Sequence, residues 1–361
     1  MITMSSKVKG LRARLKDGES VVVAEGYVIH FERLGYMQAG AWLPLVTLLY
    51  PEVVKHAYQD FVHAGSDVVV AFTYHAHRER LRSVDMEDKL ELINRQALRM
   101  AREVADDTGS LLAGNICNSN LYHPDHPERN EEIKTMFKEM IEWSLDYNVD
   151  LIIGETFMHL GEAMLALEAI KEYGKGVPSV ITLATYRVNT ENEQATMSDG
   201  VLVTEACKKL EDAGADVVGL NCSRGPAAMI QIMREVRKVC KGYLAAVPVP
   251  LRTTDKEPTF LTITDPSTGK YLYPDDLEVK SCSRKDIEEF GTACQELAIQ
   301  YVGICCGNRP AYTRALCESL GRKPPASRFS KDMSKSALFG DNPKIKKDEV
   351  EENLKLFHSK L

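Results

Sequence analysis

Eight short apolar runs, each followed by a longer segment of helical periodicity, constrain the fold of this chain more than any other feature. The runs are rich in β-branched residues and nearly continuous in apolar side chains, which is typical of parallel strands buried on both faces. Between them, in segments such as VLVTEACKKLEDAG, apolar residues recur every three or four positions, which indicates helices with one buried face. The runs are SVVVAEGY (20–27), DVVVAFTY (67–74), SLLAGNIC (110–117), DLIIGETF (150–157), SVITLATY (179–186), ADVVGLNC (215–222), YLAAVPVP (243–250) and YVGICCG (301–307).

Strict alternation of eight strands with helices predicts a closed parallel (β/α)8 barrel of the TIM type. One cassette recurs as HAGSDVVVAFT, DAGADVVGLNC and, more loosely, YNVDLIIGETF. In the first two, Gly65 and Gly214 stand where a left-handed helix cap is needed before the strand begins. An open doubly wound sheet is the alternative, but AEGYVIHFERLG after the first strand contains no G-x-G-x-x-G phosphate loop.

The length of 361 residues fits one barrel domain, predicted over 1–322, with a C-terminal extension over 323–361. This polar extension ends in an amphipathic helix and is expected to pack on the barrel or on a partner subunit of a homo-oligomer. A net charge of −7 argues against nucleic acid or anionic lipid as the main partner. No apolar run is long enough to span a bilayer, and the first residues lack the apolar core of a signal peptide. We therefore expect a soluble, cytoplasmic protein.

Three cysteines fall at predicted strand ends, where the residues of a barrel face the active site. Cys222 ends the sixth run, and Cys305 and Cys306 end the eighth. Consecutive strand residues face opposite sides, so adjacent cysteines reach one metal only where the backbone turns, and the sequence GNRP (307–310) supplies that turn. Three soft ligands with an open fourth position predict a catalytic zinc site.

Burial as small apolar side chains is the competing interpretation for any of the nine cysteines. It is the better one for Cys207, Cys240, Cys294 and Cys317, which lie in helical segments. Cys117, at the end of the third run, and Cys282 are weak candidates for a fourth ligand. Cys282 closes a long segment (252–282), rich in turn formers, that is expected to hang over the mouth of the barrel.

These motifs carry a family resemblance. GLNCS followed by GICCG resembles the paired zinc-binding signature of the homocysteine S-methyltransferases. GYVIHFERLGYMQAGAW and YPEVVKHAYQDFVHAGSDVVVAFTYHAH are similar to the betaine–homocysteine S-methyltransferase branch. The resemblance covers about 21–327 and implies a Zn²⁺-dependent transfer of a methyl group from a betaine-like onium donor to homocysteine, giving methionine.

The resemblance also implies roles for two acidic residues. Glu155 matches the family's acidic residue after the fourth strand and would bind the ammonium of homocysteine, whereas capping of the next helix is its structural alternative. The family's first strand usually ends in Asp-Gly-Gly, but this chain has Ala24-Glu25-Gly26. Glu25 could replace the missing aspartate with a longer reach, and both glutamates are predicted to be catalytic.

The donor pocket departs from the family pattern. Tyr27 and Trp42 match aromatic positions that would hold an onium cation through cation–π attraction, whereas His75 and Thr156 replace two others. Tyr74 or Tyr186 could restore the cage; a sulfonium would suit a thinner one. If His75 had an ordinary pKa near 6.5, its protonation would repel the donor below that pH. The predicted substrate-binding residues are Gly26, Tyr27, Trp42, Tyr74, His75 and Thr156.

Other functions remain open from the sequence. A sulfonium such as S-methylmethionine or dimethylsulfoniopropionate could be the donor. A corrinoid-linked thiol methyltransferase would need a separate cobalamin carrier, and no cobalamin module is visible in this chain. A zinc-binding barrel that senses thiols without catalysis is the non-enzymatic alternative.

Overall fold

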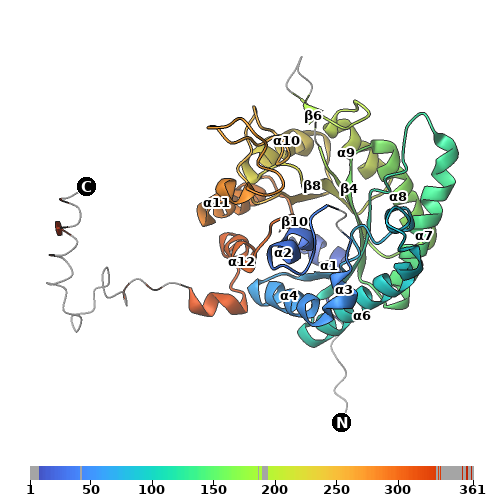
Figure 1. Cartoon of the computed structure of the whole chain (residues 1–361), viewed down its shortest axis with the longest axis horizontal. Coiled ribbons are helices and arrows are strands. Elements are labelled where there is room, and N and C mark those ends of the chain that lie inside the picture. The colour runs from blue at the N-terminus through green and yellow to red at the C-terminus, as the bar shows by residue number, and fades with distance from the viewer. Residues whose placement is uncertain are drawn as a thin grey trace, which may run out of the picture.

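The eight apolar runs form eight parallel strands, and pairing of the first strand with the last closes them into a barrel (Figure 1). The order around the barrel follows the order in the chain, as predicted. The computed structural model describes residues 8–40, 43–185, 187–188 and 194–330, and residues 332, 334, 352, 355, 356 and 359. The barrel strands are β1 (Val21–Ala24), β2 (Val68–Val70), β3 (Leu111–Cys117), β4 (Leu151–Phe157), β5 (Ser179–Leu183), β8 (Val217–Asn221), β9 (Tyr243–Val247) and β10 (Tyr301–Ile304).

Most helices, from α4 to α12, form a ring outside the strands, whereas α1 and α2 are seen within this ring (Figure 1). Helix ends follow sequence signals: proline occupies the first turn of α4, α10 and α12, where its missing N–H costs nothing, and Gly65 ends α4 with φ 119°. The helices are α1 (Leu11–Lys16), α2 (Tyr27–Arg33), α3 (Val46–Leu49), α4 (Pro51–Ala64), α5 (Arg78–Arg82), α6 (Leu90–Thr108), α7 (Asn130–Asp146), α8 (Leu160–Tyr173), α9 (Val203–Asp212), α10 (Pro226–Val239), α11 (Arg284–Glu296) and α12 (Pro310–Ser319). The short 3-10 helices of the described residues are η1 (Glu87–Lys89), η2 (Pro127–Arg129), η3 (Leu277–Lys280) and η4 (Pro325–Phe329).

Segments outside the alternation depart from the simple cassette. Strands β6 (Arg187–Val188) and β7 (Ala195–Thr196) form a small antiparallel sheet after β5, which the sequence did not predict. The 252–282 segment does reach the carboxyl end of the strands, because the Phe260 N–H donates to the Ser223 carbonyl just after β8 (2.9 Å). At the start of the extension, η4 packs against α4 and α12. The expected terminal amphipathic helix lies outside the described residues, apart from isolated positions. Within the described part, no helix is both long and apolar enough to cross a bilayer.

The aspartate of the recurring cassette has one structural role in all three copies. Each aspartate side chain accepts a hydrogen bond from the backbone N–H of the first or second residue of the preceding barrel strand. Asp67 accepts from Val22 (2.8 Å), Asp150 from Leu112 (2.8 Å) and Asp216 from Ser179 (2.9 Å). The carboxylates therefore satisfy amino-terminal N–H groups and fix where neighbouring strands pair, which leaves the carboxyl ends free for chemistry.

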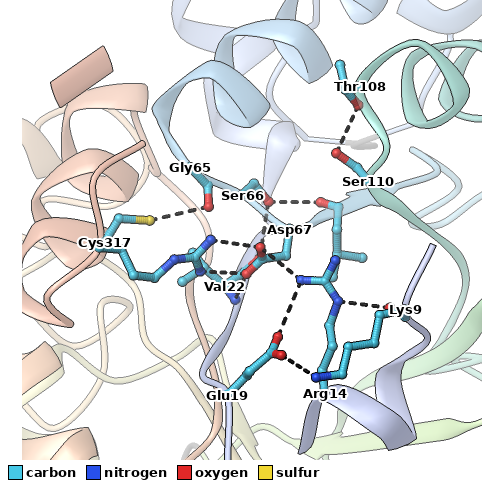
Figure 2. A network of polar contacts seen from close by, with 12 residues as sticks. Lys9, Arg14, Glu19, Val22, Gly65, Ser66, Asp67, Thr108, Ser110 and Cys317 are labelled. Atoms are coloured by element: carbon cyan, nitrogen blue, oxygen red, sulfur yellow. Dashed lines mark hydrogen bonds and ion pairs between the residues drawn. The ribbon is translucent and has the colours of Figure 1, made fainter. Parts of the chain in front are cut away.

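Asp67 also ties the two ends of the barrel sequence together (Figure 2). Arg322, just after α12, donates from both terminal nitrogens to the two carboxylate oxygens (2.6 and 2.7 Å). Arg14 donates to the same carboxylate (3.3 Å). Because the Asp67 side chain is only 11% exposed, solvent screens this network less than it screens a surface ion pair.

We predict that Asp67→Ala lowers the free energy of unfolding by about 3 kcal/mol, because it leaves two partly buried guanidinium groups and the Val22 N–H without their acceptor. Urea unfolding followed by circular dichroism measures the change. Asp107→Ala, on the exposed face of α6, is the matched control and should change stability by less than about 0.5 kcal/mol. Equal stability of the two variants would show that the network contributes nothing.

Candidate active site at the carboxyl ends of the barrel strands

Strand pairing brings residues that are far apart in sequence to one end of the barrel. The register of β1 with β10 pairs Ala24 with Ile304, so the next residues, Glu25 and Cys305, follow side by side. In the same way β3 and β4 pair Cys117 with Glu155. Active sites of barrel enzymes lie at this face, because the strand ends and the following loops meet there.

Three cysteine thiols converge at this end. One sulfur each from Cys222, Cys305 and Cys306 lies within 4.8 Å of the others, and the two adjacent sulfurs are 3.9 Å apart. Contact with Cys222 raises the pKa of the Cys305 thiol well above its ordinary value, with Cys306 and burial adding to the effect. Three thiolates this close repel one another unless a cation neutralises them. The predicted convergence of the three cysteines is therefore present in the geometry.

Gly26 allows the two adjacent cysteines to approach the first strand. It has φ 72° and caps α2, and a Cβ placed on it would lie 2.2 Å from the Cys306 nitrogen and 2.4 Å from the Cys305 carbonyl carbon. Only glycine fits both the left-handed conformation and this contact. The role of Gly26 in the structure is thus to let the backbones of the first and last strands touch beneath the thiols.

Strained backbone marks three positions at, or a few residues beyond, the carboxyl ends of the strands. His75, Thr156 and Cys222 have φ of 60°, 64° and 56°, in the left-handed region that non-glycine residues rarely adopt. Ser223 follows with φ 51°, so two such residues are consecutive at the end of β8. Strained residues persist where the surroundings fix them, and they cluster at functional sites.

The carboxylate of Glu155 is buried and held from both sides. Its Oε1 accepts from Asn115 Nδ2 (2.5 Å), and its Oε2 accepts from Asn221 Nδ2 (3.0 Å) and the Thr156 hydroxyl (3.3 Å). Burial raises the pKa of Glu155 to about 7, against the lowering effect of these donors. A carboxylate fixed this rigidly in an apolar setting is suited to a cationic partner that enters the cavity.

Glu25 lies beside this carboxylate, but its hydrogen bonding is quite different. Its side chain is 1% exposed, and neither oxygen has a hydrogen-bond partner among the described residues. One of its oxygens lies within 4.8 Å of both a Glu155 oxygen and the Cys305 sulfur. Burial, Glu155 and Cys222 together raise the pKa of Glu25 well above its ordinary value.

These groups line one pocket at the carboxyl ends of the strands. Tyr27, Phe72 and Tyr74 supply its aromatic wall. The Tyr27 ring is braced edge-on by Tyr58 (5.4 Å between centroids) and by Phe72 (5.8 Å). The lining residues are Glu25, Gly26, Tyr27, Val28, Val70, Ala71, Phe72, Tyr74, Asn115, Glu155, Thr156, Cys222, Cys305 and Cys306.

His75 lies behind this wall rather than in it. Its ring stacks on Tyr74 (4.2 Å between centroids, 29° between planes) and does not line the cavity. Burial, together with the nearby His77 and Arg80, lowers the pKa of His75 to about 3. The expectation of an ordinary pKa near 6.5 is therefore wrong: the imidazole stays neutral at neutral and mildly acidic pH, and its titration cannot gate the donor there.

The remaining predicted residues fall into three groups: those outside the described residues, the two weak candidates for a fourth ligand, and the helical cysteines. Trp42 and Tyr186 lie outside the described residues. Cys117 accepts a hydrogen bond from the His75 N–H (3.4 Å), and neither Cys117 nor Cys282 belongs to a metal-type cluster in the described part of the chain. The helical cysteines Cys207, Cys240, Cys294 and Cys317 are fully buried, as expected. Asn115 was missed, although an amide within the apolar run LLAGNIC is itself a signal.

Fold and site together define the class of the protein. A closed (β/α)8 barrel with thiols and buried carboxylates around one cavity at the carboxyl face has the architecture of a barrel enzyme. The family model for homocysteine S-methyltransferase matches residues 31–320. The chain therefore belongs to the homocysteine S-methyltransferase family and is an S-methyltransferase enzyme.

Relatives of two donor specificities resemble the chain equally well. It is 33% identical over 332 residues to the S-methylmethionine–homocysteine S-methyltransferase BHMT2 of Pongo abelii, covering 88% of this chain and 84% of the relative. It is also 33% identical over 333 residues to betaine–homocysteine S-methyltransferase 1 of Mus musculus, covering 88% of this chain and 77% of the relative. Both comparisons support the family assignment, but they do not distinguish between the two methyl donors.

A solved structure agrees on the fold. The metallated form of the homocysteine methyltransferase MmuM from Escherichia coli superposes with a TM-score of 0.65 at 16% identity, over 85% of this chain and 98% of that one.

We predict that Gly26→Ala destabilises the protein by more than about 2 kcal/mol, because the new methyl group meets the backbone of the cysteine pair as well as requiring a left-handed conformation. Gly18→Ala is the matched control: it has φ 77° with nothing within 4 Å, so only the conformational cost of about 1–2 kcal/mol remains. Urea unfolding of both variants provides the comparison. A Gly26→Ala variant no less stable than Gly18→Ala would contradict the close approach.

Proposed function

We propose that this enzyme transfers a methyl group from a betaine-like onium donor to homocysteine, giving methionine, at a zinc ion held by Cys222, Cys305 and Cys306. The observation that carries the proposal is the convergence of three thiols beside a cavity with a fixed carboxylate and an aromatic wall. The family membership and the relatives' names support the substrate. The cytoplasmic location and homo-oligomeric state expected from the sequence remain predictions.

The thiol cluster fits zinc in size and chemistry. Tetrahedral zinc with bonds of about 2.3 Å to sulfur separates its sulfur ligands by about 3.8 Å, close to the 3.9 Å between Cys305 and Cys306. Three protein ligands leave one position for a substrate thiol. Zinc bound there would hold a thiol in its nucleophilic, ionised form at neutral pH.

Glu155 is the residue that we propose for binding the ammonium of homocysteine. Asn115 and Asn221 fix its two oxygens, so its position is set before the substrate arrives. An ammonium beside the carboxylate would reverse the effect of burial and favour its ionised form. The amine and the sulfur of homocysteine are thereby held at two points, which orients the sulfur for in-line attack on a methyl group.

The aromatic wall is the part of the site suited to a cationic methyl donor. Tyr27, Phe72 and Tyr74 line the cavity on the side of β1 and β2. Aromatic faces attract an onium cation while excluding water, and they leave its methyl groups free to react. Alignment, rather than proton transfer, is what this transfer demands of the protein.

The metal assignment predicts about one zinc per chain in purified protein. Changing Cys222, Cys305 or Cys306 to Ala should abolish stoichiometric zinc, because each removes one of three ligands. Cys207→Ala, a buried helical cysteine away from the cluster, is the matched control and should keep its zinc. Elemental analysis checks both. Full zinc in Cys305→Ala, or none in carefully prepared wild type, would refute the centre.

The donor assignment predicts methionine formation with an onium compound, glycine betaine being the first to test. A panel of glycine betaine, dimethylsulfoniopropionate, S-methylmethionine and methylcobalamin with homocysteine separates the alternatives. Turnover with a sulfonium alone would keep the chemistry and change the donor. Turnover with methylcobalamin alone would refute the onium donor, and no turnover with any of them would favour a thiol sensor.

Tyr74 gives the cleanest test of the aromatic wall, because Tyr27 is packed among other rings and its removal would leave a hole. Tyr74→Leu should raise the KM for the donor about tenfold, the equivalent of ~1–2 kcal/mol of cation–π attraction, and leave homocysteine affinity unchanged. Tyr173→Leu, at the far end of α8, is the matched control.

A further inference from the structure

The turn that follows β8 holds Cys222 in a conformation that needs support. Cys222 and Ser223 both have a left-handed backbone, with φ of 56° and 51°. Residues other than glycine keep this conformation only where the surrounding structure fixes it. The Arg224 N–H donates to the Cys222 carbonyl (2.6 Å) across the turn. Because the backbone of Cys222 sets the direction of its sulfur, whatever fixes the turn also sets the place of that sulfur in the three-thiol cluster.

The side chain of Arg224 is a buried cation that joins this turn to two other segments. Its Nε donates to the Thr185 hydroxyl just after β5 (2.7 Å), and one terminal nitrogen donates to the Pro258 carbonyl in the 252–282 segment (3.4 Å). The residue is 5% exposed, and burial lowers the pKa of its guanidinium to about 10, against the opposing effect of Asp255. A charge buried this deeply depends on fixed acceptors.

The residues on either side of this arginine make parallel contacts. The Ser223 hydroxyl donates to the Thr185 carbonyl (2.9 Å), and the Phe260 N–H donates to the Ser223 carbonyl (2.9 Å). The Gly225 N–H donates to the buried Thr253 hydroxyl (2.9 Å). The turn is therefore enclosed between the end of β5 and the long segment that follows β9.

We propose that Arg224 is a positioning residue for the metal centre: its guanidinium holds the left-handed turn and thereby directs the Cys222 sulfur toward Cys305 and Cys306. The inference rests on the zinc centre proposed above. Replacing a group that orients a metal ligand from behind typically lowers metal affinity by about 10- to 100-fold. The effect of Arg224 on the reaction passes through Cys222, without contact with the substrate.

A lysine at this position separates positioning from charge. Arg224→Lys keeps the positive charge, but a single ammonium cannot replace the planar group that joins Thr185 to Pro258. Full-length protein loaded with Co²⁺ in place of zinc should lose at least about tenfold in metal affinity, measured by chelator competition. Arg234→Lys, at an exposed position of α10, is the matched control and should bind Co²⁺ as the wild type does.

Thr185 offers a second pair of variants, which covers the case in which Arg224→Lys fails to fold. Thr185→Val keeps the shape of the side chain and removes the hydroxyl that accepts from Arg224, whereas Thr185→Ser keeps the hydroxyl. We expect Thr185→Val to lower Co²⁺ affinity by at least about tenfold and Thr185→Ser to retain it.

Two measurements distinguish positioning from a general loss of stability. Asp67→Ala removes contacts at the opposite end of the barrel, so it should leave the Co²⁺ affinity of the folded protein unchanged. Hydrogen exchange in metal-free protein, followed by mass spectrometry, reports the opening of individual segments. In Arg224→Lys and Thr185→Val it should be faster than in wild type over 222–225, and unchanged over α4.

Wild-type Co²⁺ affinity in Arg224→Lys would overturn the proposal and leave the three-cysteine centre standing. A loss of affinity without faster exchange over 222–225 would also overturn it, because the turn would then be held by other contacts. Wild type that binds neither Co²⁺ nor zinc would instead refute the proposed metal centre. The exchange measurement requires no metal, so it would still decide whether Arg224 holds the turn.

Discussion

Pairing of β1 with β10 is the constraint on which the site depends. It closes the barrel, and its register sets Glu25 and Gly26 against Cys305 and Cys306, nearly three hundred positions away in the chain. The contact is so close that no side chain fits at position 26. The positions of Cys305 and Cys306 are therefore a consequence of barrel closure, whereas Cys222 is placed by the left-handed backbone at the end of β8.

Charge is the second constraint, and it acts against the fold. Three thiols and two carboxylates are concentrated in one buried region, and burial raises the pKa of both Glu25 and Glu155. The repulsion among these groups destabilises the empty site, and a bound cation relieves that repulsion. At the opposite end of the strands Asp67 is fully engaged, by Val22 (Figure 2) and by Arg322. The barrel is thus stabilised at one end and reactive at the other.

The sequence predicted the parts of this arrangement that follow from strand periodicity. All eight strands were identified, and with them the thiol convergence, because strand ends in a parallel barrel meet at one face. Properties that arise only from three-dimensional packing were missed. The pKa of His75 depends on burial behind Tyr74 and on its neighbours His77 and Arg80, and the clamp by Asn115 depends on the register of β3 with β4. The β6–β7 hairpin carries too few residues for a periodic signal.

Thr156 shows how a departure from the family pattern acquires meaning in the structure. By resemblance it replaces an aromatic position of the donor pocket, which suggested a weakened cage. Its hydroxyl instead joins Glu155 and Asn221, and its N–H donates to the same asparagine (3.0 Å). The substitution therefore exchanges aromatic surface for a firmer hold on the carboxylate. With His75 also behind the wall, the rings that line the cavity among the described residues are Tyr27, at the start of α2, and Phe72 and Tyr74, which follow β2.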